Sequence, residues 1–143
     1  MHSVHYSSRS IEWTTPDGLF RELDAEFDFT LDPASTHENA RCVKHFTIEE
    51  NGLAQSWDGE RVFCNPPYGR QIGKWVKKAA ESKALSVLLI PARTDTSYFH
   101  DYILGKAEVR FIRGRLRFGD GIGSAPFPSM IVVFRAMREE PGE

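Results

Sequence analysis

The residues best suited to chemistry in this chain are four consecutive ones, Asn65, Pro66, Pro67 and Tyr68. Proline lacks a backbone N–H, fixes φ at about −65°, and keeps the residue before it out of the helical region. The Asn65 side-chain oxygen and the Pro66 carbonyl oxygen can therefore converge on one point. Two acceptors at one point suit a planar NH₂ group, which has two N–H donors. Tyr68 adds an aromatic face on which a flat ring can stack.

An aromatic amine held in this way would be a better nucleophile. Its nitrogen lone pair is ordinarily delocalised into the ring, and acceptors on both N–H bonds favour a pyramidal nitrogen with a directed lone pair. A positively charged methyl donor in line with that lone pair would react by direct displacement, with positioning and preorganised electrostatics supplying most of the acceleration. The alternative is a rigid turn that ends a strand, with the tyrosine packed on the core.

The residues on either side of these four predict how they are held. Residues 61–64 form a short apolar stretch typical of a strand. After the motif, apolar residues recur at the spacing of one helix face; they are Ile72, Trp75, Val76, Ala79 and Ala80. The motif thus joins a strand to a helix, which is where open α/β sheets bind their ligands.

The rest of the chain alternates between strand and helix patterns. We expect further strands over residues 27–32, 43–48, 85–90, 107–112 and 130–134. We expect helices over residues 15–24, with Thr15 as the cap and Pro16 at the first helical position, and over 96–104, closed by Gly105. Asp95 would cap the second helix, and the alternative is a place beside the pocket of the acceptor amine. This alternation predicts an α/β sheet with helices on both faces. Residues 1–143 are about one domain in length.

Composition narrows the class of protein. The chain is 41% hydrophobic and 27% charged, which is ordinary globular usage and excludes disordered, collagenous, coiled-coil and disulfide-scaffold classes. No apolar run approaches the roughly 20 residues of a membrane span, and the N-terminus lacks a signal-peptide pattern. We therefore expect a soluble cytoplasmic protein with Cys42 and Cys64 reduced. His37, Cys42 and His45 match no zinc spacing, so no metal is expected. The oligomeric state stays open.

Charge is divided unevenly along the chain. Residues 1–60 carry 4 basic and 12 acidic side chains, whereas residues 61–143 carry 14 basic and 8 acidic ones. The densest basic segment is 110–117, where Arg113, Arg115 and Arg117 alternate with other residues. These arginines, together with Arg93, are candidates for contact with nucleic-acid phosphates, and the alternative is the solvated face of a strand pair. The glycine-rich segment 119–124 is either a lid or a surface loop.

Taken in order, several segments resemble the phage-type DNA N6-adenine methyltransferases, a compact Dam-like family. The resemblance extends over residues 13–135 and is carried by residues 13–16, 29–34, 39–42, 52–53, 63–69, 89–96, 111–119 and 125–129. It implies a compact Rossmann-like class I methyltransferase sheet in one domain. It also implies S-adenosyl-L-methionine as methyl donor and a flipped adenine of DNA as acceptor.

The resemblance assigns roles to individual residues. The catalytic motif corresponds to Asn65, Pro66, Pro67 and Tyr68, and the cofactor-binding positions to Trp13, Thr15, Pro16, Asp32, Pro33, Ala34 and Asn65. At a strand end, the Asp32 carboxylate would balance the ammonium or sulfonium charge of the donor, or else serve as a turn or cap residue. Trp13 would pack on the cofactor or anchor its own segment.

This chain departs from the family pattern in two places. Residues 35–39 stand where methyltransferases often have a glycine-rich loop, and Asn51 stands before Gly52 where the family pattern predicts an acid. The residue that would contact the cofactor's ribose or adenine is therefore not identified.

We expect an adenine-specific DNA methyltransferase that flips its target base and recognises a short sequence through residues 110–117. If phage-encoded, it would act in the bacterial host, and its place in restriction–modification stays open. One alternative is a methyltransferase with the same motif that acts on RNA or on protein glutamine. The others are an inactive nucleic-acid-binding module and a structural protein in which residues 65–68 are only a turn.

Overall fold

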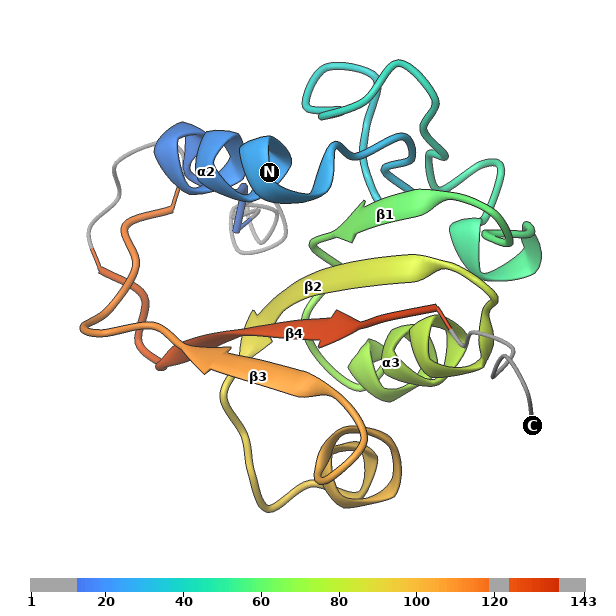
Figure 1. Cartoon of the computed structure of the whole chain (residues 1–143). Coiled ribbons are helices and arrows are strands. Elements are labelled where there is room, and N and C mark those ends of the chain that lie inside the picture. Colours follow the sequence, from blue (N-terminus) through green and yellow to red (C-terminus); the bar gives the residue numbers. More distant parts are fainter. Residues whose placement is uncertain (1–12, 119–123, 137–143) are drawn as a thin grey trace, which may run out of the picture.

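A computed structural model describes residues 13–118 and 124–136, whose strands form one mixed sheet (Figure 1). The strands are β1 (Arg61–Cys64), β2 (Leu85–Pro91), β3 (Glu108–Phe111) and β4 (Ser129–Phe134), and they lie in the order β1-β2-β4-β3. β1 runs parallel to β2, while β4 is antiparallel to both β2 and β3. These four strands lie where the sequence predicts them, because each is a short apolar or alternating run between turn residues.

The two other predicted strands are wrong in extent. Residues 27–32 contribute only Leu31 and Asp32, which bridge in parallel to Val62 and to His45. Residues 43–48 form a single parallel bridge, at His45. The apolar side chains at the ends of this stretch contribute nothing to the core, since Val43 is fully exposed and Ile48 is 93% exposed. Because Leu31 and Asp32 run parallel to β1, their carboxyl end opens at the same edge of the sheet as the ends of β1 and β2.

One face of the sheet is covered by α2 (Asp17–Phe27). Its buried residues Phe20, Leu23 and Phe27 pack with the alternate residues of the strands that face them, among them Phe63 and Val87. The helix begins later than predicted: the Pro16 carbonyl accepts from Phe20 N at 3.0 Å, and no side chain caps the helix. Thr15 is therefore not a cap residue, and its hydroxyl is available for another contact.

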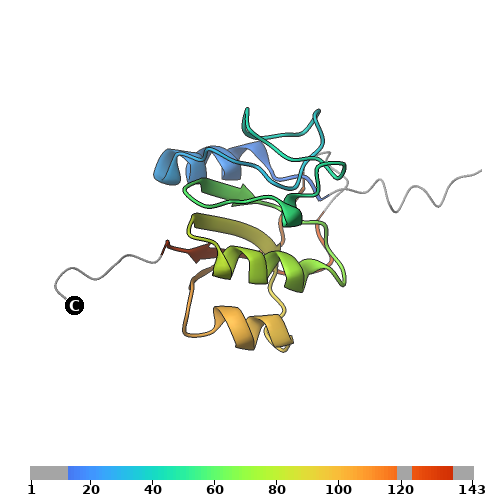
Figure 2. The same cartoon turned by 90° about the vertical axis from the view of Figure 1, so that its right-hand side faces the viewer.

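The opposite face is covered by α3 (Ile72–Glu81) and the π-helical turn η2 (Phe99–Ile103), so the sheet lies between two layers (Figure 2). The predicted apolar face of α3 is the buried one, and Trp75 stacks on Trp57 with ring centroids 6.1 Å apart. Helices on both faces of an α/β sheet are thus confirmed. No helix within residues 13–118 and 124–136 is long and apolar enough to span a bilayer.

The segment before η2 corrects one prediction. Phe99 N donates to the Thr96 hydroxyl at 3.3 Å, and that hydroxyl donates to the Arg93 carbonyl at 2.9 Å. Thr96 therefore caps this turn, and the prediction of Asp95 as the cap is wrong. Gly105 follows the turn with φ +76°, a conformation in which glycine avoids the strain of a Cβ.

Candidate active site

A cleft of about 1080 Å³ opens at the edge of the sheet where Leu31–Asp32 and β1 end. This volume is close to that of the largest small-molecule binding sites. All predicted catalytic and cofactor-binding residues line it, namely Trp13, Thr15, Pro16, Asp32, Pro33, Ala34, Asn65, Pro66, Pro67 and Tyr68. Three segments far apart in sequence thus meet at one site, because parallel strand ends share an edge.

Asn65 follows the last residue of β1, and its amide has a defined orientation. Its Nδ2 donates to the Thr15 hydroxyl at 3.1 Å and also to the Trp13 carbonyl oxygen. A carbonyl oxygen can only accept, so the atom facing it must be the amide nitrogen. The Asn65 Oδ1 is buried, and no donor reaches it among the described residues. A buried acceptor without a partner is costly, and a ligand N–H at this point would relieve that cost.

Tyr68 is held by its hydroxyl and by an aromatic cluster. The hydroxyl donates to the Leu89 carbonyl at 3.0 Å. The ring meets Phe118 and Phe127 edge to face, at centroid distances of 6.4 and 5.7 Å, and Trp13 meets both phenylalanines at 5.3 Å. Burial raises the pKa of the Tyr68 hydroxyl, which keeps it a neutral donor. Sequence reasoning did not predict that Phe118 and Phe127 pack on Tyr68, because isolated phenylalanines carry no distinguishing spacing.

Asp32 is a buried carboxylate, only 3% exposed, at the end of its short strand. Its Oδ1 accepts from Ala34 N at 3.3 Å and its Oδ2 from Arg41 N at 2.9 Å. Burial raises its pKa, although these two N–H donors oppose the shift. Within the described residues no cation lies at ion-pair distance from it. Asp32 therefore organises a turn, and it lines the cleft without an ion-pair partner among the described residues; its role toward the charge of a donor stays a prediction.

Comparison with known proteins adds evidence independent of this geometry. The family model described as DNA N-6-adenine-methyltransferase (Dam) matches residues 3–142. The chain belongs to the Dam family. This confirms the resemblance drawn from the sequence motifs.

Two phage proteins named DNA N-6-adenine-methyltransferase are similar to this Dam-family chain. The one from Escherichia phage T1 is 32% identical over 109 residues, which are 73% of this chain and 45% of that protein. The one from Haemophilus phage HP1 (strain HP1c1) is 26% identical over 134 residues, which are 85% of this chain and 77% of that protein. The chain therefore spans less than half the length of the T1 relative and about three quarters of the HP1 relative.

In this Dam-family chain, Arg41 joins the two sides of the cleft. Its guanidinium donates from Nη2 to the Thr15 carbonyl, and its Nη1 lies 2.7 Å from an Asp17 carboxylate oxygen. The guanidinium also lies over the Phe20 ring, 5.3 Å from its centroid. Arg41 thus fixes residues 13–17, the N-terminal strap, against the Asp32 turn. Sequence reasoning missed this role, and the one signal was an isolated arginine in the acidic half of the chain.

The turn that contains Gly52 forms another wall of the cleft. A Cβ on Gly52 would lie 2.0 Å from the Pro33 carbonyl oxygen, and the Gly52 carbonyl accepts from Trp57 Nε1 at 3.0 Å. Glu50 accepts from Thr47 N at 2.7 Å and is occupied by its own turn. Asn51, which stands where the family pattern predicts an acid, lines the cleft, and Glu38 lines it from the segment that follows Asp32.

The predicted nucleic-acid-binding arginines are only partly assembled at the cleft. Arg117 lines it, whereas Arg93, Arg113 and Arg115 are exposed outside the lining. Arg110 is committed elsewhere, because its guanidinium binds Glu26 through two bonds of 2.8 and 2.7 Å and Glu108 at 2.6 Å. Within the segment 110–117, Arg110 is thus engaged by two glutamates of the chain itself, and the role of the segment as a recognition surface stays a prediction.

Two further expectations concern loops near the cleft. Segment 119–124 has only Ser124 within the described residues, where it is bridged to Arg117. The lid or loop expected over residues 119–123 therefore lies outside the described residues.

The residues considered for a zinc site lie near one another. His37 Nδ1 lies 2.9 Å from His45 Nε2, and Cys42 is half-buried. In the part of the chain that is described, no three potential metal ligands gather.

Proposed function

We propose that this chain transfers a methyl group from S-adenosyl-L-methionine to the N6 amino group of a flipped adenine in DNA. The observation that carries the proposal is the Asn65 Oδ1, a buried acceptor that no donor reaches among the described residues, on a residue that lines the cleft together with Pro66 and Tyr68. The family membership and the names of the phage relatives support the same chemistry. The sheet, with β4 antiparallel between β2 and β3, is compatible with a Rossmann-like class I methyltransferase domain over residues 1–143.

The residues present fit the proposed cofactor. Asp32 offers a buried carboxyl group that has no ion-pair partner within residues 13–118 and 124–136, which suits the ammonium or sulfonium group of the donor. Trp13, Thr15 and Pro16 would cover the cofactor, and Pro33 and Ala34 would contact it from the strand end. When bound, S-adenosyl-L-methionine supplies an electrophilic methyl carbon on a positively charged sulfur that leaves as a neutral thioether. The cleft is large enough for a cofactor beside a base.

The residues of the catalytic motif act on the acceptor amine. Asn65 Oδ1 and the Pro66 carbonyl would accept its two N–H bonds and so direct the nitrogen lone pair toward the methyl carbon. The amine forms one N–C bond as the methyl carbon–sulfur bond breaks, and it then loses one N–H proton to solvent. Pro67 holds the motif rigid, and Tyr68 provides a stacking face. Unpairing the base costs a few kcal/mol, which stacking of about 1–3 kcal/mol and these hydrogen bonds offset.

DNA would approach the cleft through phosphate contacts. Arg117 lies at the cleft, and Arg93, Arg113 and Arg115 are exposed and without ion-pair partners among the described residues. Arginines of this kind position a nucleic acid without recognising its sequence.

The proposal is tested by labelled methyl transfer with the purified chain. DNA, RNA and a glutamine-containing protein are offered separately, and the DNA product is digested to nucleosides to identify N6-methyladenine. We expect label in adenine of DNA, and none with the Asn65→Ala variant, which circular dichroism must show to be folded at the assay temperature because it also loses the amide bonds to Thr15 and Trp13. Label in RNA or glutamine would replace the proposed substrate. A folded chain that binds S-adenosyl-L-methionine but labels none of the three would contradict an enzymatic role.

A further inference from the structure

Both N–H bonds of the Asn65 amide end on the N-terminal strap, at the Thr15 hydroxyl and the Trp13 carbonyl. We propose that these two groups are positioning residues, which fix the orientation of the Asn65 amide so that its oxygen faces the acceptor amine. This inference rests on the proposed function, since it concerns the same site. It adds a role for the strap beyond covering the cofactor.

The two ends of an asparagine amide are nearly equal in size, so packing alone selects poorly between them. A half-turn of the amide would place its NH₂ where Oδ1 now lies, and the NH₂ would then oppose the N–H donors of the adenine instead of accepting from them. The Trp13 carbonyl prevents this rotation because it can only accept, and Oδ1 in its place would be repelled. The Thr15 hydroxyl supplies the second acceptor. Together they leave Oδ1 as the only end of the amide that can face a ligand.

The strap has the rigidity that this role requires. Thr15 is only 4% exposed, so water does not compete for its hydroxyl. Its carbonyl accepts from the Arg41 guanidinium, which also pairs with Asp17. Arg41 N in turn donates to Asp32. A continuous set of contacts therefore runs from the carboxylate on the cofactor side of the cleft to the amide on the acceptor side.

The first test measures the amide itself and requires no activity. In a ¹³C,¹⁵N-labelled chain, the Asn65 side-chain NH₂ signals are assigned by their loss in Asn65→Ala. We expect slow exchange with solvent and a scalar coupling across the hydrogen bond to the Trp13 carbonyl carbon. Thr15→Val should shift these signals and accelerate their exchange, and Thr15→Ser should restore the wild-type pattern. Fast exchange in the wild-type chain, with no such coupling, would overturn the proposal.

The second test measures the consequence for methyl transfer. Loss of one hydrogen bond that orients the amide should lower the single-turnover rate of Thr15→Val about tenfold. Thr15→Ser should stay within about twofold of wild type, and the KM for S-adenosyl-L-methionine should change less than the rate. A raised KM with an unchanged rate would assign Thr15 to cofactor binding only and overturn the positioning role. No methyl transfer by the wild-type chain would contradict the proposed function, while the amide signals would still decide the positioning.

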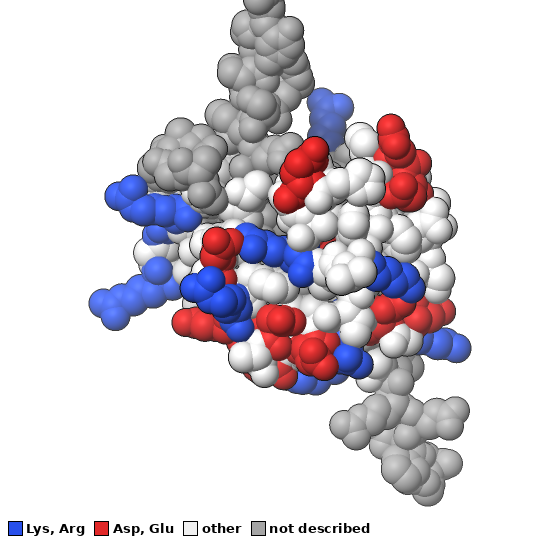
Figure 3. Space-filling model, turned by 90° about the horizontal axis from the view of Figure 1, so that it is seen from above, with Lys and Arg blue, Asp and Glu red and all other residues white. Residues whose placement is uncertain are grey.

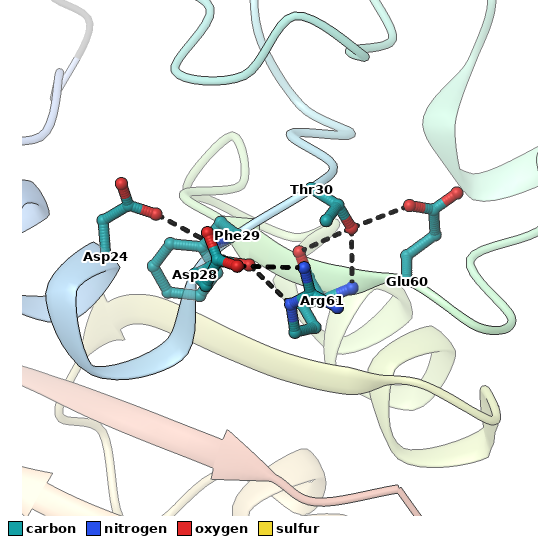
Figure 4. Close-up of polar contacts among 6 residues, drawn as sticks. All are labelled: Asp24, Asp28, Phe29, Thr30, Glu60 and Arg61. Atoms are coloured by element: carbon teal, nitrogen blue, oxygen red, sulfur yellow. Dashed lines mark hydrogen bonds and ion pairs between the residues drawn. The ribbon is translucent and has the colours of Figure 1, made fainter.

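A matched control lies at the other end of β1 (Figure 4). There the Thr30 hydroxyl accepts from Arg61 N at 2.8 Å and donates to Glu60 Oε1 at 2.8 Å, close to the pair formed by Arg61 and Asp28. Thr30→Val makes the same chemical change as Thr15→Val outside the cleft lining. It should lower the melting temperature without altering the Asn65 signals or the methyl-transfer rate. Equal effects from both variants would show that the loss is general and overturn the specific role of Thr15.

Discussion

At the scale of single residues, the cleft holds two polar groups in states that are unfavourable without a ligand. The Asn65 oxygen is buried without a donor, and the Asp32 carboxylate is buried without a cation among the described residues. Each state costs free energy in the free protein, and each is relieved by a group of the proposed substrates. Paired burial of this kind is typical of a site prepared for an amine on one side and a cation on the other.

Asn65→Asp tests the acceptor side of the cleft. A carboxylate at this position would face the Trp13 carbonyl, which now accepts from the amide, and two acceptors would repel each other. We expect methyl transfer to fall on the order of 10²-fold, the effect typical of losing one preorganised group. Single-turnover assays beside Asn65→Ala would measure it. Wild-type activity in Asn65→Asp would show that the Trp13 carbonyl does not restrict this position.

The raised pKa of Asp32 predicts a pH dependence of cofactor binding. Protonation removes the charge that would balance a cationic ligand, and the raised pKa places this loss at higher pH than for an ordinary carboxyl group. Affinity for S-adenosyl-L-methionine should therefore be full at high pH and should weaken as pH falls through the pKa of Asp32. Calorimetric titrations at successively lower pH would measure this. Asp32→Asn should bind more weakly and lose the dependence; an unchanged pH profile in that variant would exclude Asp32 as its source.

At the scale of secondary-structure elements, the cleft is formed by turns that cross the ends of strands. The strap precedes α2, the catalytic motif joins β1 to α3, and η1 (Gly52–Ala54) packs against the residues that follow Asp32. Such turns tolerate little change where two backbones touch. Gly52 is the clearest case, because the Pro33 carbonyl occupies the place of its absent side chain.

Gly52→Ala should therefore lower both stability and cofactor affinity. The added Cβ would overlap the Pro33 backbone, so one of the two turns must move, at a cost of about 1–3 kcal/mol. Gly18→Ala is the matched control, since its Cβ would meet nothing within 4 Å in the first turn of α2. Alanine should stabilise that helix by roughly 0.5–1 kcal/mol. Chemical denaturation and calorimetry would measure both; equal stability changes would refute the close contact at Gly52.

At the scale of the whole molecule, the acidic N-terminal half and the basic C-terminal half of the sequence do not form two separate charged regions on the face seen in Figure 3. On the face seen in Figure 3, acidic and basic side chains lie interspersed in the part that the structure describes. Among the described residues, ion pairs engage five basic side chains, Arg41, Lys44, Arg61, Arg110 and Arg135, and Arg110 binds both Glu26 and Glu108. The arginines left without ion-pair partners among the described residues include Arg93, Arg113, Arg115 and Arg117.

These unpaired arginines predict the salt dependence of DNA binding. A side chain that neutralises a phosphate steepens the fall in affinity with salt, so Arg115→Ala and Arg117→Ala should each reduce the slope of log K against log salt by about 1. Arg110→Ala should leave the slope unchanged, because that guanidinium is held by two glutamates. Fluorescence anisotropy over a salt series would measure the slopes. A reduced slope for Arg110→Ala, with unchanged slopes for the other two variants, would instead indicate that DNA binds at Arg110, on the surface formed by α2 and β3.

The sequence determined the elements whose signal is local. Strand β2, helix α3 and the motif between β1 and α3 follow from short apolar runs, from helical spacing and from paired prolines, because backbone conformation responds to near neighbours. For the same reason the position of the motif at a cleft was predictable: Asn65 and Pro66 follow a strand, and they line the cleft at its end.

Only the tertiary structure decided how those residues are held. Asn65 donates to a threonine 50 residues earlier, and Arg110 pairs with a glutamate 84 residues earlier. Arg41 in its turn links Asp32 to the strap. Side-chain hydrogen bonds of this kind depend on which segments the sheet brings together, and no periodicity records that. The chemical groups of the site are therefore encoded locally, whereas their orientation is a property of the folded chain.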